Sequence, residues 1–174
     1  MKPSELLDII EEEFGAFILE SSDEGFDPYI VVEPDSLRDI SFFLRDDERM
    51  QFDFLRTSLG MDKIEFIESL FVLYSYDLKH QLIVKVELDH KKPEVDTVAD
   101  IWKAANWYER ESYDLLGINY IGHPDLRRLM MPSDWVGHPL RKDYKQPKKY
   151  HDIDLYRFNP VLKVPAKKAK KKKK

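Results

Sequence analysis

The fold of this chain is decided by residues 66–88, which read FIESLFVLYSYDLKHQLIVKVEL. In the second half, apolar side chains recur at every other position from Leu82 to Leu88, with Lys85 and Glu87 between them. A period of two residues is typical of a β-strand with one buried face. The polar residues 77–81 separate two such stretches. We therefore expect a hairpin formed by residues 66–76 and 82–88, with one buried face and one wetter face.

Upstream of this hairpin, the sequence predicts a helix, a strand and a second helix. Ser4 is a candidate N-cap of the first helix and Gly15 a stop signal. A strand is expected at Tyr29–Val32 because Pro34 ends it, and Asp35 can then cap the second helix. The side chains expected to face the core are Leu6, Leu7, Ile10 and Phe14 in the first helix, and Leu37, Ile40, Phe43 and Leu44 in the second. The pattern of residues 52–59 leaves both a strand and the end of a helix open.

Downstream, a third helix is expected from Thr97 to Gly117. Thr97 and Asp100 have the spacing of a capping pair, and Gly117 suits the left-handed position after a helix. At about 100° per residue, one stripe of this helix would pack on the sheet. That stripe contains Ile101, Ala104, Ala105, Tyr108, Ser112, Leu115 and Leu116. Beyond it, prolines at 124, 132, 139, 147, 160 and 165 indicate mostly extended, irregular chain.

These elements predict an α/β (α+β) fold, with a small mixed or antiparallel sheet, packed helices and a long irregular C-terminal extension. We expect the α/β domain at residues 1–117, an extended segment that clasps partners at 118–166 and a disordered tail at 167–174. Seven of the last eight residues are lysine, which is the composition of a solvated tail.

Charge is divided unevenly along the chain. Residues 1–100 carry 10 basic and 25 acidic groups, a net of −15, whereas residues 101–174 carry 18 and 8, a net of +10. We expect the basic part to lie on an acidic partner, although a merely solvated extension is the simpler alternative. Basic residues do not alternate with aromatic ones in the expected folded part, so nucleic-acid binding is not expected.

The composition excludes several kinds of site. The chain has no cysteine, which rules out disulfides, thiolate zinc sites and thiolate-bound iron–sulfur clusters. No apolar run approaches the roughly 20 residues of a membrane-spanning helix. The N-terminus lacks the features of an export or import signal, so a cytoplasmic protein is the default expectation.

Ionisable and aromatic residues concentrate between Glu109 and Tyr144. Glu109 and Glu111 could suggest a pair of catalytic carboxylates, but two residues of helix rotate the chain by about 200°, so they cannot share a proton. Arg110 should point away from the apolar stripe, one turn before Asp114, a spacing that permits an ion pair. We expect the acids to bind arginines returned by the following loop, with Arg127, Arg128 and Arg141 as candidates.

Two histidines in this segment have a structural and a metal-binding interpretation. His123 and His138 each stand inside Gly-His-Pro and could ligate a metal together with Asp125 or His151. Their spacing matches no metal-site signature, and a histidine before proline commonly hydrogen-bonds the backbone of its own loop. We expect loop-shaping histidines. No nucleophile–histidine–acid order, phosphate-binding loop or dinucleotide fingerprint is present.

The same segment resembles a known family. ERESYDLLGI at 109–118, GHPDLRR at 122–128 and DWVGHPLRKDY at 134–144 closely resemble the C subunit of bacterial NADH–quinone oxidoreductase, the respiratory complex I. The resemblance extends upstream through residues 98–107 and the hairpin, and covers roughly residues 28–145. It is weaker at 58–63 and 145–150, which read SLGMDK and KQPKKY.

This resemblance implies a cofactor-free, non-catalytic subunit of the hydrophilic arm. Its partners would be the B and D subunits, FMN and iron–sulfur clusters would lie in partner subunits, and quinone would be contacted only indirectly. The chain would be peripheral, at the cytoplasmic face of the cell membrane, within an enzyme that couples electron transfer to ion translocation. The residues implied at interfaces or in the structural motif are Glu109, Arg110, Glu111, Asp114, His123, Arg127, Arg128, His138, Arg141, Asp143 and Tyr144.

The sequence leaves two alternatives open. The same architecture serves membrane-bound hydrogenases and dehydrogenases that use ferredoxin or another donor, and the sequence does not choose among electron donors. A free-standing metal-dependent enzyme that uses His123 and His138 is the more distant alternative.

Overall fold

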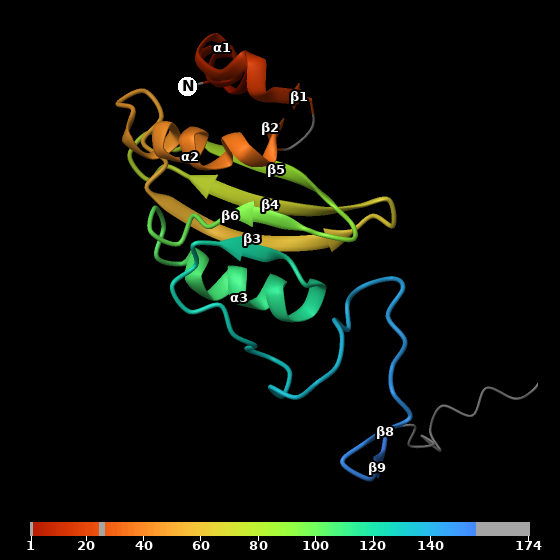
Figure 1. Ribbon diagram of the computed structural model, residues 1–174. Coiled ribbons are helices and arrows are strands. Elements are labelled where there is room, and N and C mark those ends of the chain that lie inside the picture. Colours follow the sequence, from red (N-terminus) through yellow and green to blue (C-terminus); the bar gives the residue numbers. More distant parts are fainter. Residues whose placement is uncertain (1, 25–26, 156–174) are drawn as a thin grey trace, which may run out of the picture. The chain divides into compact units, whose positions relative to one another are not determined.

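The computed structural model describes residues 2–24 and 27–155 and contains a five-stranded mixed sheet with helices (Figure 1). The strand order is β1-β2-β5-β4-β3. In chain order the elements are α1 (Pro3–Phe14), the 3₁₀ turn η1 (Gly15–Phe17), β1 (Ile18–Ser22), β2 (Tyr29–Val32), the 3₁₀ turn η2 (Pro34–Ser36), α2 (Leu37–Asp46), β3 (Phe54–Asp62), β4 (Phe66–Tyr74), β5 (Gln81–Asp89), β6 (Glu94–Asp96), α3 (Ala105–Leu116), β7 (Asn119–Ile121), β8 (Lys149–Tyr150) and β9 (Ile153–Asp154).

The expected hairpin is confirmed as β4 and β5. The two strands pair antiparallel, from Phe66 opposite Asp89 to Tyr74 opposite Gln81. The turn between them is closed where the Ser75 N–H donates to the His80 carbonyl at 3.0 Å. β3 pairs antiparallel with β4, so the ambiguous segment before the hairpin is a strand. β2 runs parallel to β5, which makes the sheet mixed, as the sequence allowed.

The N-terminal part differs from expectation in three places. Asp35 does not cap the second helix, because it lies inside η2 and Ser36 is at the N-cap position of α2. Lys2 is at the N-cap position of the first helix, where its backbone N–H donates to the Glu5 carboxylate at 3.1 Å. Pro3 is the first helical residue, so Ser4 is not the N-cap. Proline suits that position because its fixed φ is helical and its missing N–H would be unpaired there anyway. The sequence also missed β1, whose residues ILESS show no apolar alternation. β1 forms because its backbone pairs antiparallel with β2 at the edge of the sheet.

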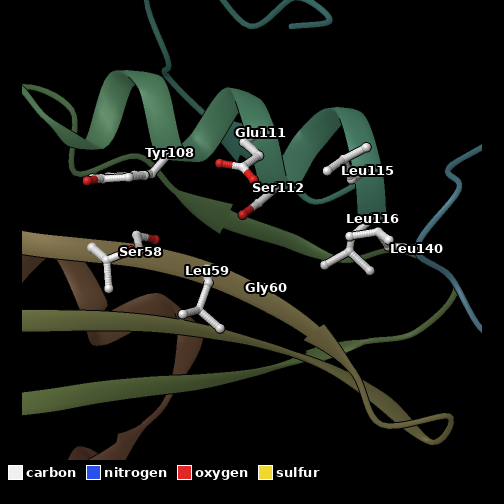
Figure 2. A pocket seen from close by; sticks show the side chains of 10 residues that line it. Ser58, Leu59, Gly60, Tyr108, Glu111, Ser112, Leu115, Leu116 and Leu140 are labelled. Atoms are coloured by element: carbon white, nitrogen blue, oxygen red, sulfur yellow. The ribbon is translucent and has the colours of Figure 1, made fainter. Parts of the chain in front are cut away.

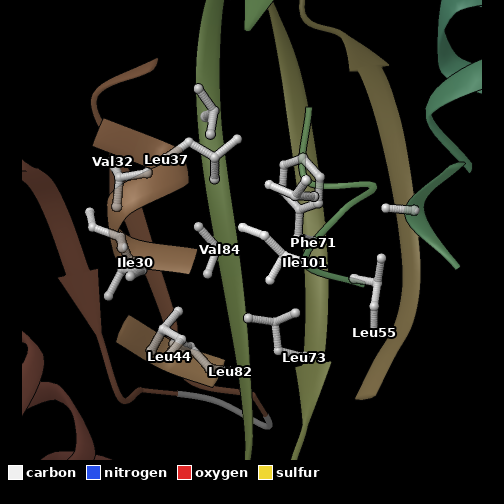
Figure 3. Close-up of a cluster of buried hydrophobic side chains, with 14 of the residues drawn as sticks. Ile30, Val32, Leu37, Leu44, Leu55, Phe71, Leu73, Leu82, Val84 and Ile101 are labelled. Atoms are coloured by element: carbon white, nitrogen blue, oxygen red, sulfur yellow. The ribbon is translucent and has the colours of Figure 1, made fainter. Parts of the chain in front are cut away.

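One face of the sheet forms the hydrophobic core. Figure 3 shows side chains of β2, β3, β4 and β5 converging with Leu37 and Leu44 of α2 and with Ile101. Fully burying each such aliphatic side chain contributes roughly 1.5–3 kcal/mol. The sheet residues labelled in this cluster are Ile30, Val32, Leu55, Phe71, Leu73, Leu82 and Val84.

The third helix is shorter than predicted, because it begins at Ala105 and not near Thr97. Residues 98–102 form turns instead, in which the Trp102 backbone N–H donates to the Val98 carbonyl at 2.9 Å. The Trp102 ring is 4% exposed and donates from Nε1 to the Phe52 carbonyl at 2.8 Å. Burial of this ring against the sheet therefore fixes the chain before the helix. The apolar stripe drawn through Ile101 and Ala104 does not exist as one helical face.

Two glycines allow α3 to lie where it does. Gly117 follows the helix at φ 79°, the left-handed conformation expected for this position. Gly60 of β3 lies directly under the helix end. A Cβ on Gly60 would come 2.5 Å from Leu116 Cδ1 and 3.0 Å from Ile118 Cδ1. A Cβ at position 60 would therefore force the ends of the Leu116 and Ile118 side chains to move, so glycine suits this close approach of α3 to β3.

The chain divides into two compact units, and the first of them ends at Tyr144. The first unit extends past α3 because β7 pairs parallel with β6, and because the buried Tyr120 hydroxyl hydrogen-bonds Ser69 of β4 at 3.1 Å. The irregular extension is confirmed from Gly122 to Lys148, where no helix or strand occurs.

In the second unit, β8 and β9 pair antiparallel. The expected lysine-rich tail, residues 167–174, lies outside the described residues. Within the described parts of the chain, no helix is both long enough and apolar enough to span a membrane.

Candidate functional site

The two acids that flank Arg110 on α3 occupy opposite environments. Glu109 is completely buried, whereas Glu111 is exposed. Their separation by helical rotation follows the sequence prediction, and they do not form a catalytic pair. Each carboxylate therefore needs its own explanation.

Glu109 binds the turn that precedes its own helix. One carboxylate oxygen accepts the Val98 N–H at 2.9 Å and the other accepts the Thr97 hydroxyl. Burial raises the pKa of Glu109 to about 7, against the opposing effect of these two hydrogen bonds. The expectation that Glu109 binds an arginine is wrong. Thr97 is expected from the sequence to be the N-cap of the third helix. Instead, its hydroxyl donates to Glu109 and so connects the preceding turn to the helix.

Asp114 and Arg128 do form the ion pair that the sequence suggested. Arg128 Nη1 donates to Asp114 Oδ1 at 2.6 Å, and the Asp114 carboxylate is fully buried. The other oxygen, Oδ2, accepts the backbone N–H groups of Leu129, Met130 and Met131, at 2.6–3.0 Å. One carboxylate thus binds both a guanidinium and three successive amides of the loop after Arg128. We call this cluster the Asp114–Arg128 node.

The node is electrostatically balanced. Burial raises the pKa of Asp114, but the three amides and the Arg128 guanidinium outweigh burial, so the net pKa lies below its ordinary value. Arg128 Nη2 also donates to the carbonyls of Trp135 at 2.9 Å and Gly137 at 3.1 Å. This guanidinium therefore ties together both ends of residues 128–137, which would otherwise have no secondary structure to hold them.

Both candidate metal-binding histidines bond the backbone. His123 Nδ1 accepts the Asp125 N–H at 3.0 Å, so its proton is on Nε2, which donates to the Asn106 carbonyl at 3.1 Å. His138 Nδ1 donates to the Asp114 carbonyl at 3.0 Å. The His138 ring also lies against Gly117, where a Cβ would come within 2.7 Å of it. Their role as loop-shaping groups matches the structural interpretation of the sequence.

Arg110 does not point into solvent, and it does not pair with Asp114. It is only 5% exposed, its guanidinium lies 5.1 Å from the centre of the Trp107 ring, and its Nε donates to the Arg127 carbonyl at 3.3 Å. Arg127 itself is exposed and pairs with Asp125 at 2.9 Å. Sequence spacing could not predict these contacts of Arg110, because Arg127 is brought to it by the folding of the loop and not by helical periodicity.

The last predicted residues lie near the end of the β3–β4 hairpin. Arg141 donates to the His90 carbonyl, and the Lys142 N–H donates to the buried Asp62 at 2.7 Å. Asp62, His90 and Asp143 bring potential ligand atoms within 4.8 Å of one another. Asp62 is already bonded by backbone amides and by His90, so these groups form a polar junction between hairpin and loop.

Tyr144 closes the segment, because its hydroxyl accepts the Trp135 Nε1–H at 3.0 Å. The loop from Arg128 to Tyr144 is thus bonded to itself as well as to α3. Nothing in the sequence indicated that Trp135 would be the partner of Tyr144.

A small cavity lies between β3 and α3, beside these loops (Figure 2). Its volume is about 220 Å³. Figure 2 shows the Glu111 carboxylate on the α3 side and the Ser58 hydroxyl on the β3 side, with Leu140 at one end. We call this feature the β3–α3 groove, and it is lined by Thr57, Ser58, Leu59, Gly60, Tyr108, Glu111, Ser112, Leu115, Leu116 and Leu140.

Comparison with known proteins agrees with this arrangement. The family model "Respiratory-chain NADH dehydrogenase, 30 Kd subunit" matches residues 30–150. The chain belongs to this family. The resemblance inferred from the motifs at 109–144 is therefore confirmed, and most of the compact unit and all the predicted interface residues lie within the matched range.

Members of the 30 kDa subunit family include clear relatives of this chain. It is 42% identical to the C subunit of the NADH-quinone oxidoreductase of Chloroherpeton thalassium, over 84% of its own length and 62% of that protein. It is 38% identical to the protein of the same name from Chlorobium phaeobacteroides, over 85% of this chain and 92% of the relative. The chain thus spans less than two thirds of the first relative and nearly all of the second.

Two solved structures share the fold. A trypsin-resistant fragment (1-134) of Nqo5 matches 72% of this chain and 100% of the fragment, with 25% identity and a TM-score of 0.60. A chain of the membrane-bound sulfane sulfur reductase, an archaeal respiratory membrane complex, matches 91% of this chain and 96% of its own, with 25% identity and a TM-score of 0.67. Both the family and the fold are therefore those of a subunit of a multisubunit complex.

Proposed function

We propose that this chain is a cofactor-free support subunit in the hydrophilic arm of a complex I type NADH–quinone oxidoreductase. Electron transfer from NADH to quinone, and the coupled ion translocation, would take place in the other subunits. The observation that carries the proposal is the family match over residues 30–150. The two bacterial relatives, with 38–42% identity, point to the same complex.

The geometry between Glu109 and Tyr144 supports a binding role over a catalytic one. The buried carboxylates of Glu109 and Asp114 hold backbone amides, and the side chains of His123 and His138 hold backbone carbonyls. Groups with these partners shape loops and are not directed at a substrate. With no cysteine in the chain, thiolate-bound iron–sulfur clusters would be held by neighbouring subunits, and we propose that FMN is held there too.

The proposed neighbours are the B and D subunits, with quinone reached only through them. We propose a peripheral position at the cytoplasmic face of the cell membrane. The net charge of +10 over residues 101–174 supports contact with acidic surfaces of these neighbours, because complementary charge guides and orients association. The segment 118–166 would be the part that clasps them.

A second candidate function is the equivalent subunit in a related complex with another electron donor or acceptor. The observation that favours it is the match to a chain of the sulfane sulfur reductase, which covers 91% of this chain. The two functions differ in the partners that accompany the chain and not in its own fold.

The test is affinity purification of the tagged full chain from its native membranes, followed by identification of every co-purified subunit. We expect the B and D subunits together with NADH- and flavin-binding subunits, and NADH–quinone reductase activity in the eluate. Recovery of hydrogenase or sulfur-reductase subunits without NADH-binding ones would select the second function. Recovery of the chain alone, from membranes in which the complex is intact, would refute both.

A further inference from the structure

We propose that the β3–α3 groove binds an extended segment of a partner subunit that carries a lysine or arginine beside a small apolar residue. The basic side chain would pair with Glu111, and the apolar one would fill the cavity against Leu115, Leu116 and Leu140. This proposal rests on the proposed function, since it requires that the chain have partner subunits.

Glu111 supplies the charge for this interaction. Its carboxylate is exposed at the groove, and among the described residues none forms a hydrogen bond or ion pair with it. Two basic residues of the segment from Glu109 to Tyr144 are engaged elsewhere, because Arg110 lies over Trp107 and Arg128 binds Asp114. A single exposed acid is ordinarily just solvated. Here it borders a cavity, as do the exposed acids Glu11, Glu20 and Asp100, but each of those three already has a side-chain partner.

The opposite wall is the edge of the sheet. β3 is the last strand in the order, so within residues 2–24 and 27–155 no strand pairs with the outer side of its backbone. In an edge strand, N–H and C=O groups of alternate residues turn outward, and extended peptides commonly pair with them. The Tyr108 hydroxyl already donates to the Arg56 carbonyl at 3.2 Å. The backbone from Thr57 to Gly60, next to it, lines the groove.

The size of the cavity argues for a side chain and against a cofactor. Its volume of about 220 Å³ lies below the roughly 300–1,000 Å³ of small-molecule sites. Ser58, which is 4% exposed, faces the groove with a hydroxyl that has no hydrogen-bond partner among the described residues. A buried hydroxyl usually has a partner, so a polar group of the incoming segment that reached Ser58 would remove the cost of leaving this hydroxyl unpaired.

The groove is also formed in advance. The Leu140 N–H donates to the Leu115 carbonyl at 3.0 Å, which fixes Leu140 at the end of α3 although its side chain is 58% exposed. The Asp114–Arg128 node holds the loop that leads to Leu140. A binding site that is already ordered loses little conformational entropy on association, so even a short segment could bind.

The first experiment replaces Leu140 with a photo-crosslinking amino acid in the full chain, irradiates the native complex and maps the crosslinked peptide by mass spectrometry. We expect one segment of one partner subunit, with a lysine or arginine within a few residues of the crosslink. Crosslinks to a second copy of this chain, to a partner segment without a basic residue, or to lipid alone would overturn the proposal.

The second experiment reverses the charge with Glu111→Lys and uses Glu87→Lys as the matched control. Glu87 is also exposed but lies on β5, away from the groove. We expect Glu111→Lys to lower the amount of chain incorporated into the complex by about tenfold, and Glu87→Lys to leave it within about twofold. Changing the crosslinked basic residue of the partner to glutamate should restore incorporation of Glu111→Lys.

Thermal melts of the free chains separate binding from folding. Glu111 is exposed and has no described partner, so both variants should melt close to the wild-type chain. If the wild-type chain co-purifies with its complex but Glu111→Lys and Glu87→Lys are incorporated equally, the groove proposal is overturned. Failure of the wild-type chain to co-purify would instead count against the proposed function.

Discussion

At the scale of single residues, the buried carboxylates of α3 carry most of the order in the segment that follows. Asp114 accepts a guanidinium and three amides, and Glu109 accepts an amide and a hydroxyl. Breaking a buried ion pair by removing one partner leaves the other charge without compensation. An exposed pair is worth much less because water screens it.

We expect Asp114→Asn to lower the free energy of unfolding by about 3 kcal/mol, because Arg128 would stay partly buried without its anion. The control is Asp125→Asn, which breaks the exposed pair with Arg127 and should cost less than about 1 kcal/mol. Urea denaturation of the two variants measures the difference. Similar losses for both would mean that the Asp114–Arg128 node does not hold the loop.

The protonation of Glu109 should make the stability of the chain depend on pH. Its pKa in the folded chain is about 7, above the ordinary 4.5. Between these values the folded state keeps a proton that the unfolded chain has released, so this residue lowers stability as pH rises from about 4.5 to about 7. Thr97, Asp100, Tyr120 and His123 are the ionisable or hydroxyl groups that surround it.

Glu109→Gln should remove that dependence. Glutamine can accept the Val98 N–H and donate to the Thr97 hydroxyl oxygen, as protonated glutamic acid does. We therefore expect the variant to match the wild-type chain near pH 4.5 and to gain on it by up to about 3 kcal/mol at pH 8. Denaturation curves from pH 4.5 to pH 8 measure the gain. A constant difference across that range would contradict the assignment.

At the scale of elements, the end of α3 depends on backbone geometry. Gly117 has a φ of 79° and lies under the His138 ring. We expect Gly117→Ala to cost about 2 kcal/mol, since alanine is strained in the left-handed region and its Cβ would displace the ring. Gly15→Ala is the control, because Gly15 has a φ of −54° and open space around its Cα. Its melting temperature should be unchanged or slightly raised.

If Gly117→Ala melted like Gly15→Ala, the contact between His138 and the helix end would not contribute to stability.

The hairpin can be recognised without any tertiary contact, because the alternation from Leu82 to Leu88 is local. The start of α3 does need tertiary contacts. The sequence suggests Thr97 as the N-cap. In the structure, the Thr97 hydroxyl and the Val98 N–H both donate to the carboxylate of Glu109, and the helix begins later.

At the scale of the whole molecule, the compact unit ends at Tyr144. We expect a chain truncated after Tyr144 to unfold cooperatively with nearly the wild-type free energy. A chain truncated after Gly117 should lose at least about 4 kcal/mol, because Ile118 and Tyr120 are buried and Arg128 would be removed. Calorimetry of both truncations tests this. Equal stability of the two would return the boundary to Gly117.

Four features could be predicted without a structure, namely the sheet hairpin, the left-handed glycine after α3, the fold class and the family. Each of these depends on local periodicity, on the backbone freedom of one residue or on a motif with many defined spacings. The exclusion of thiolate-held clusters likewise needs only the absence of cysteine.

The partners of the charged residues depend on how the chain folds back on itself. The spacing of Arg110 and Asp114 allowed a pair within the helix, yet Asp114 binds Arg128 and Arg110 covers Trp107. The edge strand β1 was invisible for the same reason, since its stability comes from pairing with β2 and not from its own side chains. A charged side chain can pair either within its helix or with a residue far away in the sequence. Which pair forms here depends on how the loop from Gly122 to Tyr144 folds back on α3.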